Sequence, residues 1–211
     1  MPIVINGSGT VTGINVGGLP DGIVDTDMIA NNAVTSAKAT GLGGITVCDH
    51  WFFESNASSG TNGILGDSGG AGGGPWNKRS SSTASVTTVT TGSGGGRFSF
   101  PTTGMYLITG SFQTYHNTND NDMGISATIT SDNFTNTEIL GYIRNTFNAS
   151  GTPNAYHQGS ASFIFDVTDT SNCKFYWNQG SVATNNYVVG ANASGNGPIL
   201  TTCIIMRLGD T

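Results

Sequence analysis

Residues 96–115 read GRFSFPTTGMYLITGSFQTY, and this stretch carries the strongest indication of the fold class. Tyr106, Ile108 and Gly110 alternate with their neighbours at the two-residue period of a β-strand. An aromatic run precedes the Pro-Thr-Thr-Gly segment, whose proline and glycine are typical of a turn. The stretch therefore predicts two antiparallel strands joined by a short turn.

The same alternation recurs throughout residues 45–211, which we expect to form the main domain. Ala161, Phe163, Phe165 and Val167 are predicted to share one face of a strand, with the intervening residues on the other. Turn-forming residues separate further strand-like runs: ITVCDHWFF, TASVTTVTT, MGISATIT, TEILGYIR, CKFYWNQ, NYVVGA and PILTTCIIMRL. Many short strands without a helical pattern predict an all-β sandwich, most simply a jelly roll.

The composition supports an all-β protein and argues against several functional classes. The 211 residues include 32 glycines, and 9% of the residues are charged while 36% are hydrophobic. Only 7 residues are lysine or arginine and the net charge is −6, which argues against nucleic acid as a partner. We expect no membrane insertion, because no apolar run approaches about 18 residues, and no secretory signal peptide.

The cysteines, Cys48, Cys173 and Cys203, are too far apart in the sequence for a metal-binding motif. Their apolar neighbours predict small buried thiols without a redox or catalytic role. Free thiols of this kind fit a protein that is made and assembled in a reducing cytoplasm.

Two short segments precede the main domain. Residues 1–21 alternate β-favouring runs with glycines and are too short to form a core, so we expect them to anchor on another protein or on sister chains. Residues 22–44 contain a weak ten-residue repeat, with apolar pairs every five residues, and end in a glycine linker. This period predicts a narrow β shaft. The alternative is a short amphipathic helix from about Asp25 to Lys38.

Three quoted stretches resemble the C1q/TNF-like jelly-roll family: residues 96–115, the segment SASFIFDVTDTSNCKFYW (160–177) and the closing TTCIIMRLGDT. The resemblance implies a homotrimer in which aromatic residues of one face pack along the threefold axis. Several side chains are accordingly predicted to face the core or that axis: Phe100, Tyr106, Phe163, Phe165 and Ile205.

The N-terminal stretch resembles a different group of proteins. INGSGTVTGINVGGLPDGIVDTDMIANNAVTSAK, residues 5–38, is similar to N-terminal segments of bacteriophage fibre and decoration proteins. The resemblance implies that residues 1–41 contact another virion protein. It places the protein on the virion exterior, after synthesis in the cytoplasm of the bacterial host.

Two patterns suggest catalysis, but we interpret both as structural. Residues 66–70 read GDSGG, the string around the nucleophile of chymotrypsin-like proteases, but too few residues precede Ser68 to supply the rest of a triad. Asp166 and Asp169 resemble the paired carboxylates of a glycosidase active site. Their setting, FDVTDTSN, instead predicts a turn in which aspartate side chains accept bonds from backbone amides. We therefore expect no enzyme activity and no cofactor.

The run Asn119–Asp122 is rich in oxygen ligands, so Asp120 and Asp122 are weak candidates for calcium. We interpret the run as a polar loop, because a calcium ion needs six to eight oxygens in a fixed arrangement. The histidines are expected to be packed or surface residues rather than metal ligands: His50, His116 and His157.

These observations favour a structural or binding protein. The leading hypothesis is a trimeric fibre or spike of a tailed bacteriophage, whose head contacts a host receptor, most simply a surface glycan. The alternatives are a capsid decoration or cement protein and, less favoured, a glycan-degrading enzyme. Receptor contacts are assigned to polar and aromatic residues of the loops: Trp76, Tyr156, Trp177, Asn119 and Asn121.

Overall fold

The computed structural model describes the main domain in several stretches. These are residues 45–67, 75–79, 86–89, 96–116, 122–146, 155–180, 186–190 and 200–210. All of them belong to the unit Gly43–Thr211. The anchoring segment 1–21 and the neck 22–44 lie outside the described residues, so their structures stay predictions.

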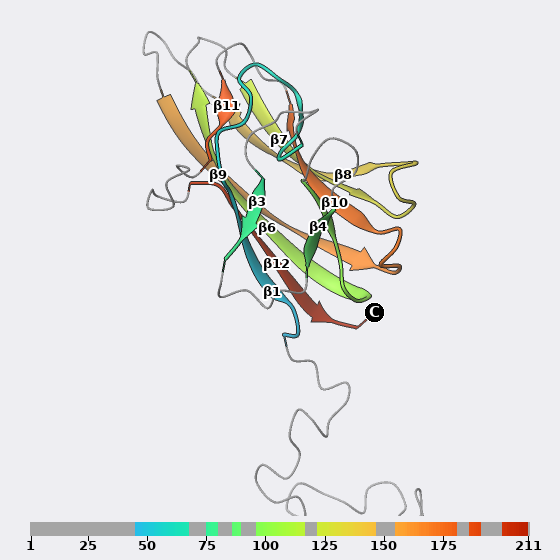
Figure 1. Ribbon diagram of the computed structural model, residues 1–211. Coiled ribbons are helices and arrows are strands. Elements are labelled where there is room, and N and C mark those ends of the chain that lie inside the picture. Colours follow the sequence, from blue (N-terminus) through green and yellow to red (C-terminus); the bar gives the residue numbers. More distant parts are fainter. Residues whose placement is uncertain are drawn as a thin grey trace, which may run out of the picture. The chain divides into compact units, whose positions relative to one another are not determined.

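The described strands form two antiparallel sheets, which we call sheet A and sheet B (Figure 1). Sheet A contains β1 (Cys48–Phe53), β3 (Trp76–Lys78), β6 (Gly104–His116), β9 (Ala155–Val167), β11 (Tyr187–Val188) and β12 (Thr202–Gly209). Sheet B contains β2 (Gly63–Ile64), β4 (Thr87–Val89), β5 (Arg97–Ser99), β7 (Asp122–Thr130), β8 (Glu138–Thr146) and β10 (Lys174–Gly180). This is the predicted all-β jelly-roll sandwich.

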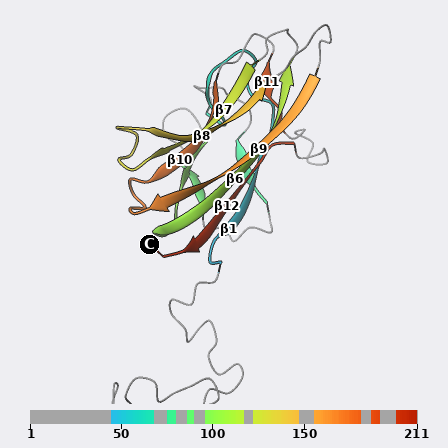
Figure 2. The same ribbon diagram turned by 180° about the vertical axis from the view of Figure 1, so that it is seen from behind.

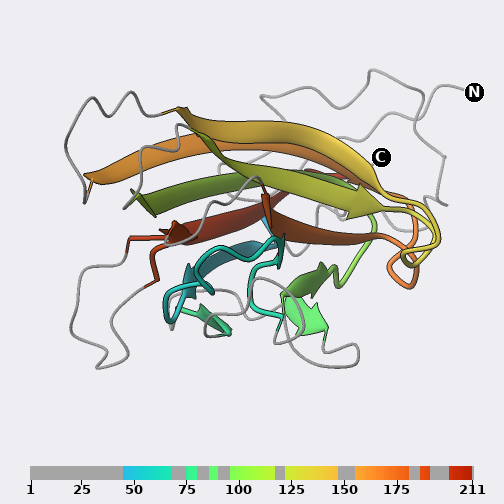
Figure 3. The same ribbon diagram turned by 90° about the horizontal axis from the view of Figure 1, so that it is seen from above.

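Strand β6 lies in the middle of sheet A. It pairs along its whole length with β9, and its other edge pairs with β12 and then with β11. Seen from behind, β9, β6, β12 and β1 therefore lie side by side in this order (Figure 2). On one flank of the sandwich, β8 of sheet B runs beside β9 of sheet A (Figure 3).

The two ends of the sandwich differ in what they carry. Gly104 and Gly209 lie at the end where β1 begins, which we call the entry end, because the chain enters the domain there. The last residues of β6, the first residues of β9 and the short strand β11 lie at the opposite end, which we call the far end (Figure 1).

The core between the sheets is largely aromatic. The ring of Phe98 lies 5.3 Å from that of Trp51 and 5.8 Å from that of Phe175, and Phe112 lies 4.7 Å from Trp177. Such edge-to-face and offset contacts add about 0.5–1.5 kcal/mol each to the free energy gained by burial. The large rings also explain Gly110 on β6, because a Cβ atom there would lie 2.4 Å from the ring of Trp177.

A buried ion pair attaches the short strands to sheet A. Asp49 of β1 is fully buried, accepts a hydrogen bond from the amide of Val86 at 2.7 Å and pairs with the Nζ atom of Lys78 at 3.2 Å. Lys78 also lies over the ring of Trp51. A buried carboxylate needs such partners, because an unpaired one is costly. This set of contacts holds β3 and the segment before β4 against β1.

The predicted alternation of β9 is confirmed. Phe165 and Val167 are buried, whereas Ile164 between them is 56% exposed. Phe163 is half-buried, with its ring 6.0 Å from that of Trp177. Of the remaining side chains predicted to face inward, all are buried: Phe100, Tyr106 and Ile205.

The cysteine prediction is right for two of the three residues. Cys173 and Cys203 are buried and free, and burial raises the pKa of Cys203 to about 12. Cys48 is free but only half-buried. Its prediction as a buried thiol was wrong, because its place in β1 alternates with that of the buried Asp49 and puts it on the opposite face of the sheet.

The strand register predicts how substitutions at neighbouring positions of β9 differ. Phe165→Ala should lower the free energy of unfolding by about 3–5 kcal/mol, because it leaves a cavity beside Phe100 and Tyr106. Asp166→Asn, at the neighbouring exposed position of β9, should change it by less than about 0.5 kcal/mol. Urea unfolding followed by intrinsic fluorescence measures both. Equal losses for the two variants would contradict the register.

Candidate functional site

One face of sheet A is turned away from the core, and we call it the open face. It consists of the outward side chains of β9, β6, β12 and β1, which the strand register arranges in rows across the sheet. Three successive rows, from the entry end onward, are Ile164–Leu107–Met206–Cys48, Ser162–Thr109–Ile204–His50 and Ser160–Ser111–Thr202–Phe52. The rows change in chemistry along the face.

The part of the open face near the entry end is largely apolar, apart from the exposed Asp166. Ile164, Ile204 and Leu208 are 56%, 37% and 47% exposed, and Leu107 and Met206 lie between them. Covering apolar surface stabilises a complex by about 25 cal/mol per Å² removed from water. An exposed apolar patch is therefore a candidate contact surface.

The middle of the open face is polar, with uncharged groups on β9 and β6 and the guanidinium of Arg79 over the ring of Phe52 on β1. The hydroxyl groups of Thr109 and Ser162 lie 2.8 Å apart across β6 and β9, and Gln158 donates to the Oγ atom of Ser111 at 3.0 Å. Burial, and secondarily the positive charge of Arg79, lower the pKa of His50 below its ordinary value of 6.5. His50 is therefore neutral near pH 7.

Three tyrosines lie together at the far end of the open face. Tyr156 of β9, Tyr115 of β6 and Tyr187 of β11 form one row across the strands. The ring of Tyr115 lies 5.1 Å from that of Tyr156 and 5.0 Å from that of Tyr187. Burial and the neighbouring phenol groups raise the pKa of Tyr187 above 10.0, so the phenol is neutral near pH 7. We call this row the tyrosine row.

A buried glutamine holds Tyr187 in place. Gln179 of β10 is fully buried, accepts a hydrogen bond from the amide of Val188 at 2.9 Å and donates to the carbonyls of Ser58 and Thr61. Val188 is itself fully buried. The two-residue strand β11 is therefore fixed on its inner side, while Tyr187 next to Val188 faces outward beside Tyr115.

The turn between β7 and β8 is a second candidate site. The carboxylate of Asp132 accepts bonds from the hydroxyl of Thr130 and from the backbone and side-chain amides of Asn136. These bonds, with those of Asn136 first, lower the pKa of Asp132. They also hold two residues in left-handed conformations, Asn133 at φ 53° and Phe134 at φ 71°.

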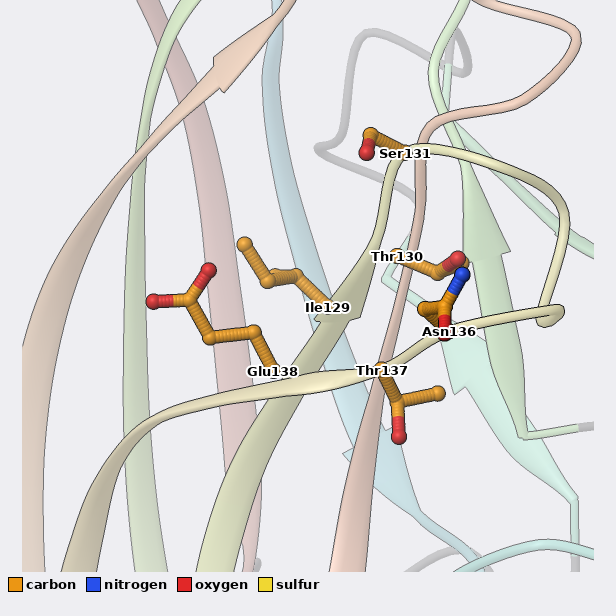
Figure 4. Close-up of a pocket in the computed structure, with 6 residues that line it drawn as sticks. All are labelled: Ile129, Thr130, Ser131, Asn136, Thr137 and Glu138. Atoms are coloured by element: carbon orange, nitrogen blue, oxygen red, sulfur yellow. The ribbon is translucent and has the colours of Figure 1, made fainter.

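A pocket of about 160 Å³ lies beside this turn (Figure 4). Its lining residues are Ile129, Thr130, Ser131, Asn136, Thr137 and Glu138. Thr130 and Asn136 lie close together in Figure 4, and both already donate to Asp132. These two polar residues of the pocket therefore stabilise the turn itself, and we take the open face as the better candidate for binding.

Two predicted receptor contacts were wrong. Trp76 and Trp177 are 3% and 0% exposed, because they lie on strands β3 and β10 rather than in surface loops. The Nε1 atom of Trp76 donates to the carbonyl of Leu65 at 3.1 Å, and its ring packs on Phe53. Neither tryptophan can reach a receptor in this arrangement.

Of the other predicted site residues, only Tyr156 has a side chain within the described part of the structure. Tyr156 is 58% exposed on the open face, as a contact residue requires. Asn119, Asp120 and Asn121 lie outside the described residues, and so does the side chain of Asp122 at the start of β7. Within the described stretches, no three histidine, cysteine, aspartate or glutamate side chains form a group that could hold a metal ion.

The two catalysis-like patterns contain residues with structural contacts. Asp169 accepts a bond from the amide of Ser171 at 2.7 Å and another from the side chain of Asn172, as predicted for a turn. The first of these bonds contributes most to lowering the pKa of Asp169. In the GDSGG string, Asp67 pairs with Arg97 at 3.1 Å, whereas Ser68 lies outside the described residues.

The remaining histidines lie inside the sandwich near the far end. His116 is 1% exposed, and its Nε2 atom lies 3.0 Å from the hydroxyl of Thr114. Its ring meets that of His157 edge to face at 5.7 Å. His116 is thus packed, one of the two positions (packed or surface) expected for the histidines. Among the described residues there is no helix long and apolar enough to cross a membrane.

Comparison with known proteins identifies the fold. No protein-family model matches this chain, and no curated protein sequence matches it. Among solved structures, Eiger TNF from S. frugiperda superposes with a TM-score of 0.55 at 11% identity, covering 80% of this chain and 96% of that one. Murine APRIL at pH 5.0 gives a TM-score of 0.47 at 13% identity, covering 77% of this chain and 98% of that one. The likeness to Eiger TNF shows that the main domain has the TNF-like jelly-roll fold expected from the sequence.

The contacts of Gln179 yield a prediction about the tyrosine row. Gln179→Leu should lower the free energy of unfolding by about 1–3 kcal/mol, because it leaves the buried amide of Val188 without its partner and removes two bonds to the segment 58–61. Hydrogen exchange of the Val188 amide should become faster. Gln158→Leu, at an exposed position of β9, is the control and should change stability by less than about 0.5 kcal/mol. Unchanged exchange at Val188 in the Gln179 variant would contradict this role.

Proposed function

We propose that this chain is an exterior structural protein of a tailed bacteriophage. In this proposal it forms a homotrimeric fibre or spike, and its jelly-roll head contacts a receptor on the host surface. The observation that carries the proposal is the open face of sheet A, which is apolar near the entry end and rich in hydroxyl, amide and phenol groups beyond it. The first part suits contact between copies, and the second suits contact with a ligand.

Self-association explains the apolar part of the face. Leu107, Met206 and Ile164 form a row on a β surface that one chain leaves uncovered. The flank formed by β8 also exposes Ile139 at 51% and Tyr142 at 57%. When the face of one chain receives the flank of the next, the contact is of the head-to-tail type, which closes into a ring if the rotation allows. Three copies give the trimer that the C1q/TNF-like resemblance implies.

The direction of the chain supports an attachment role. The domain begins at the entry end, whereas the tyrosine row lies at the far end. Any segment that precedes Ile45 is therefore joined to the domain at the end opposite the tyrosines. With residues 1–41 bound to another virion protein, as their resemblance implies, this arrangement suits presentation of the far end to the host.

A non-enzymatic role agrees with the contacts of the aspartates. Asp67 of the GDSGG string is paired with Arg97, and Asp169 accepts the bonds of its own turn. Both carboxylates therefore already take part in structural contacts. A binding or structural function requires no catalytic role from them.

The trimer can be tested by placing a charge in the apolar row. Met206→Lys should convert a particle of three times the 21.7 kDa chain mass into folded monomers, because the charge of each lysine would be buried against the apolar flank of the next copy. Ser131→Lys, at an exposed turn of sheet B, is the control and should leave the trimer intact. Light scattering after size exclusion measures the mass, and circular dichroism verifies folding. A wild-type monomer would overturn the trimer.

Particles that lack the protein test its role on the virion. If the protein is the receptor-binding spike, such particles should adsorb to host cells at a strongly reduced rate while keeping their heat stability. Residual free phage over time measures adsorption, and genome release on heating measures stability. Normal adsorption with early genome release would instead favour a capsid decoration protein.

A further inference from the structure

His50 borders the apolar part of the open face, which the proposed trimer uses for contact between copies. It lies directly opposite Ile204 of β12, and the next row toward the entry end contains Met206 and Cys48. The side chain of His50 is half-buried in the single chain. A neighbouring copy packed on the apolar part covers it further, so the charge of His50 affects the contact between copies.

A positive charge is already fixed beside His50. The backbone amide of Arg79, directly after β3, donates to the carbonyl of His50 at 2.8 Å. The guanidinium carbon of Arg79 lies 5.3 Å from the centre of the ring of Phe52, which is the next outward residue of β1. Protonation of His50 would therefore add a second positive charge to the same part of the face.

The described strands beside His50 carry their carboxylates on the other face or farther away. Asp49 lies on the core side of β1, where it pairs with Lys78. Asp166 is on β9, which is separated from β1 by β6 and β12. On the face of His50 itself, the neighbouring residue of β1 is Cys48. The β12 residues opposite and beside His50 are uncharged: Ile204, Thr202 and Met206.

The flank that the next copy brings to this face is largely uncharged. Glu138 and Arg144 are the charged residues of β8, and the five residues between them are ILGYI. Ile139 and Tyr142 of this stretch are 51% and 57% exposed, and the proposed contact buries them. A positive charge covered by such a surface loses its hydration without gaining a partner, which is costly.

The neutral form of His50 is the one that suits contact between copies. Burial, and secondarily the charge of Arg79, already lower the pKa of His50 below 6.5 in the single chain. Covering the ring with another copy lowers the pKa further, because it removes more water. Separated chains therefore bind more protons than the trimer in acid, and proton uptake favours separation. The trimer is fully stable above the single-chain pKa and loses stability as the pH falls through it.

We propose that His50 makes the trimer sensitive to acid, because protonation of its imidazole on the covered face separates the copies. The inference rests on the proposed trimer, for which it names a means of regulation at the contact between copies. Each copy contributes one such imidazole, so dissociation of one trimer takes up as many as three protons. The heads stay joined near neutral pH and separate in mild acid.

The full-length chain can be tested by sedimentation of a fluorescently labelled dilution series near pH 7 and at about pH 5, where carboxylates remain largely ionised. The dissociation constant of the wild-type trimer should rise by about tenfold or more at the lower pH. His50→Gln, which is uncharged at both values, should lose this difference. Arg79→Gln should keep it with the midpoint at a higher pH, because one positive charge fewer opposes protonation.

His157→Gln is the matched control, because it removes an imidazole from inside the sandwich rather than from the open face. This variant should keep the acid sensitivity of the wild type, and circular dichroism at both pH values verifies that the separated chains remain folded. An equal acid sensitivity in His50→Gln and the wild type would overturn the inference.

Two further results would also contradict a role for His50. One is a wild-type trimer whose dissociation constant is the same at both pH values. The other is a trimer that becomes tighter in acid, which would place a carboxylate of the next copy, such as Glu138, against protonated His50. A wild-type monomer near pH 7 would instead overturn the proposed trimer itself, so the two failures are distinguishable.

Discussion

The register of β6 is the constraint on which both the core and the open face depend. This strand of 13 residues alternates buried and outward side chains without a break. Its inward residues, such as Ile108 and Phe112, pack in the core, and its outward residues, such as Leu107 and Tyr115, form the centre of the open face. A shift of one residue would exchange the two sets. Stability and surface chemistry are therefore coupled through a single strand.

The sequence predicted the long strands because their faces follow from local alternation. It did not predict β2 and β3, which are two and three residues long inside a glycine-rich stretch. These strands are held in place by pairing with strands elsewhere in the chain, β2 with β10 and β3 with β1. The same reason explains the wrong prediction for Trp76, since only the packing of β3 against the core shows that its ring is buried.

The candidate site was predictable only in part. Alternation along β6 and β9 indicates that Tyr115 and Tyr156 share a face, but not that Tyr187 joins them. Strand β11 has two residues, and it is placed by pairing with β6 and by the side chain of the buried Gln179. No local sequence pattern predicts that the side chain of a buried glutamine will hold a distant strand in place. The row of three tyrosines is a product of contacts between segments distant in the sequence.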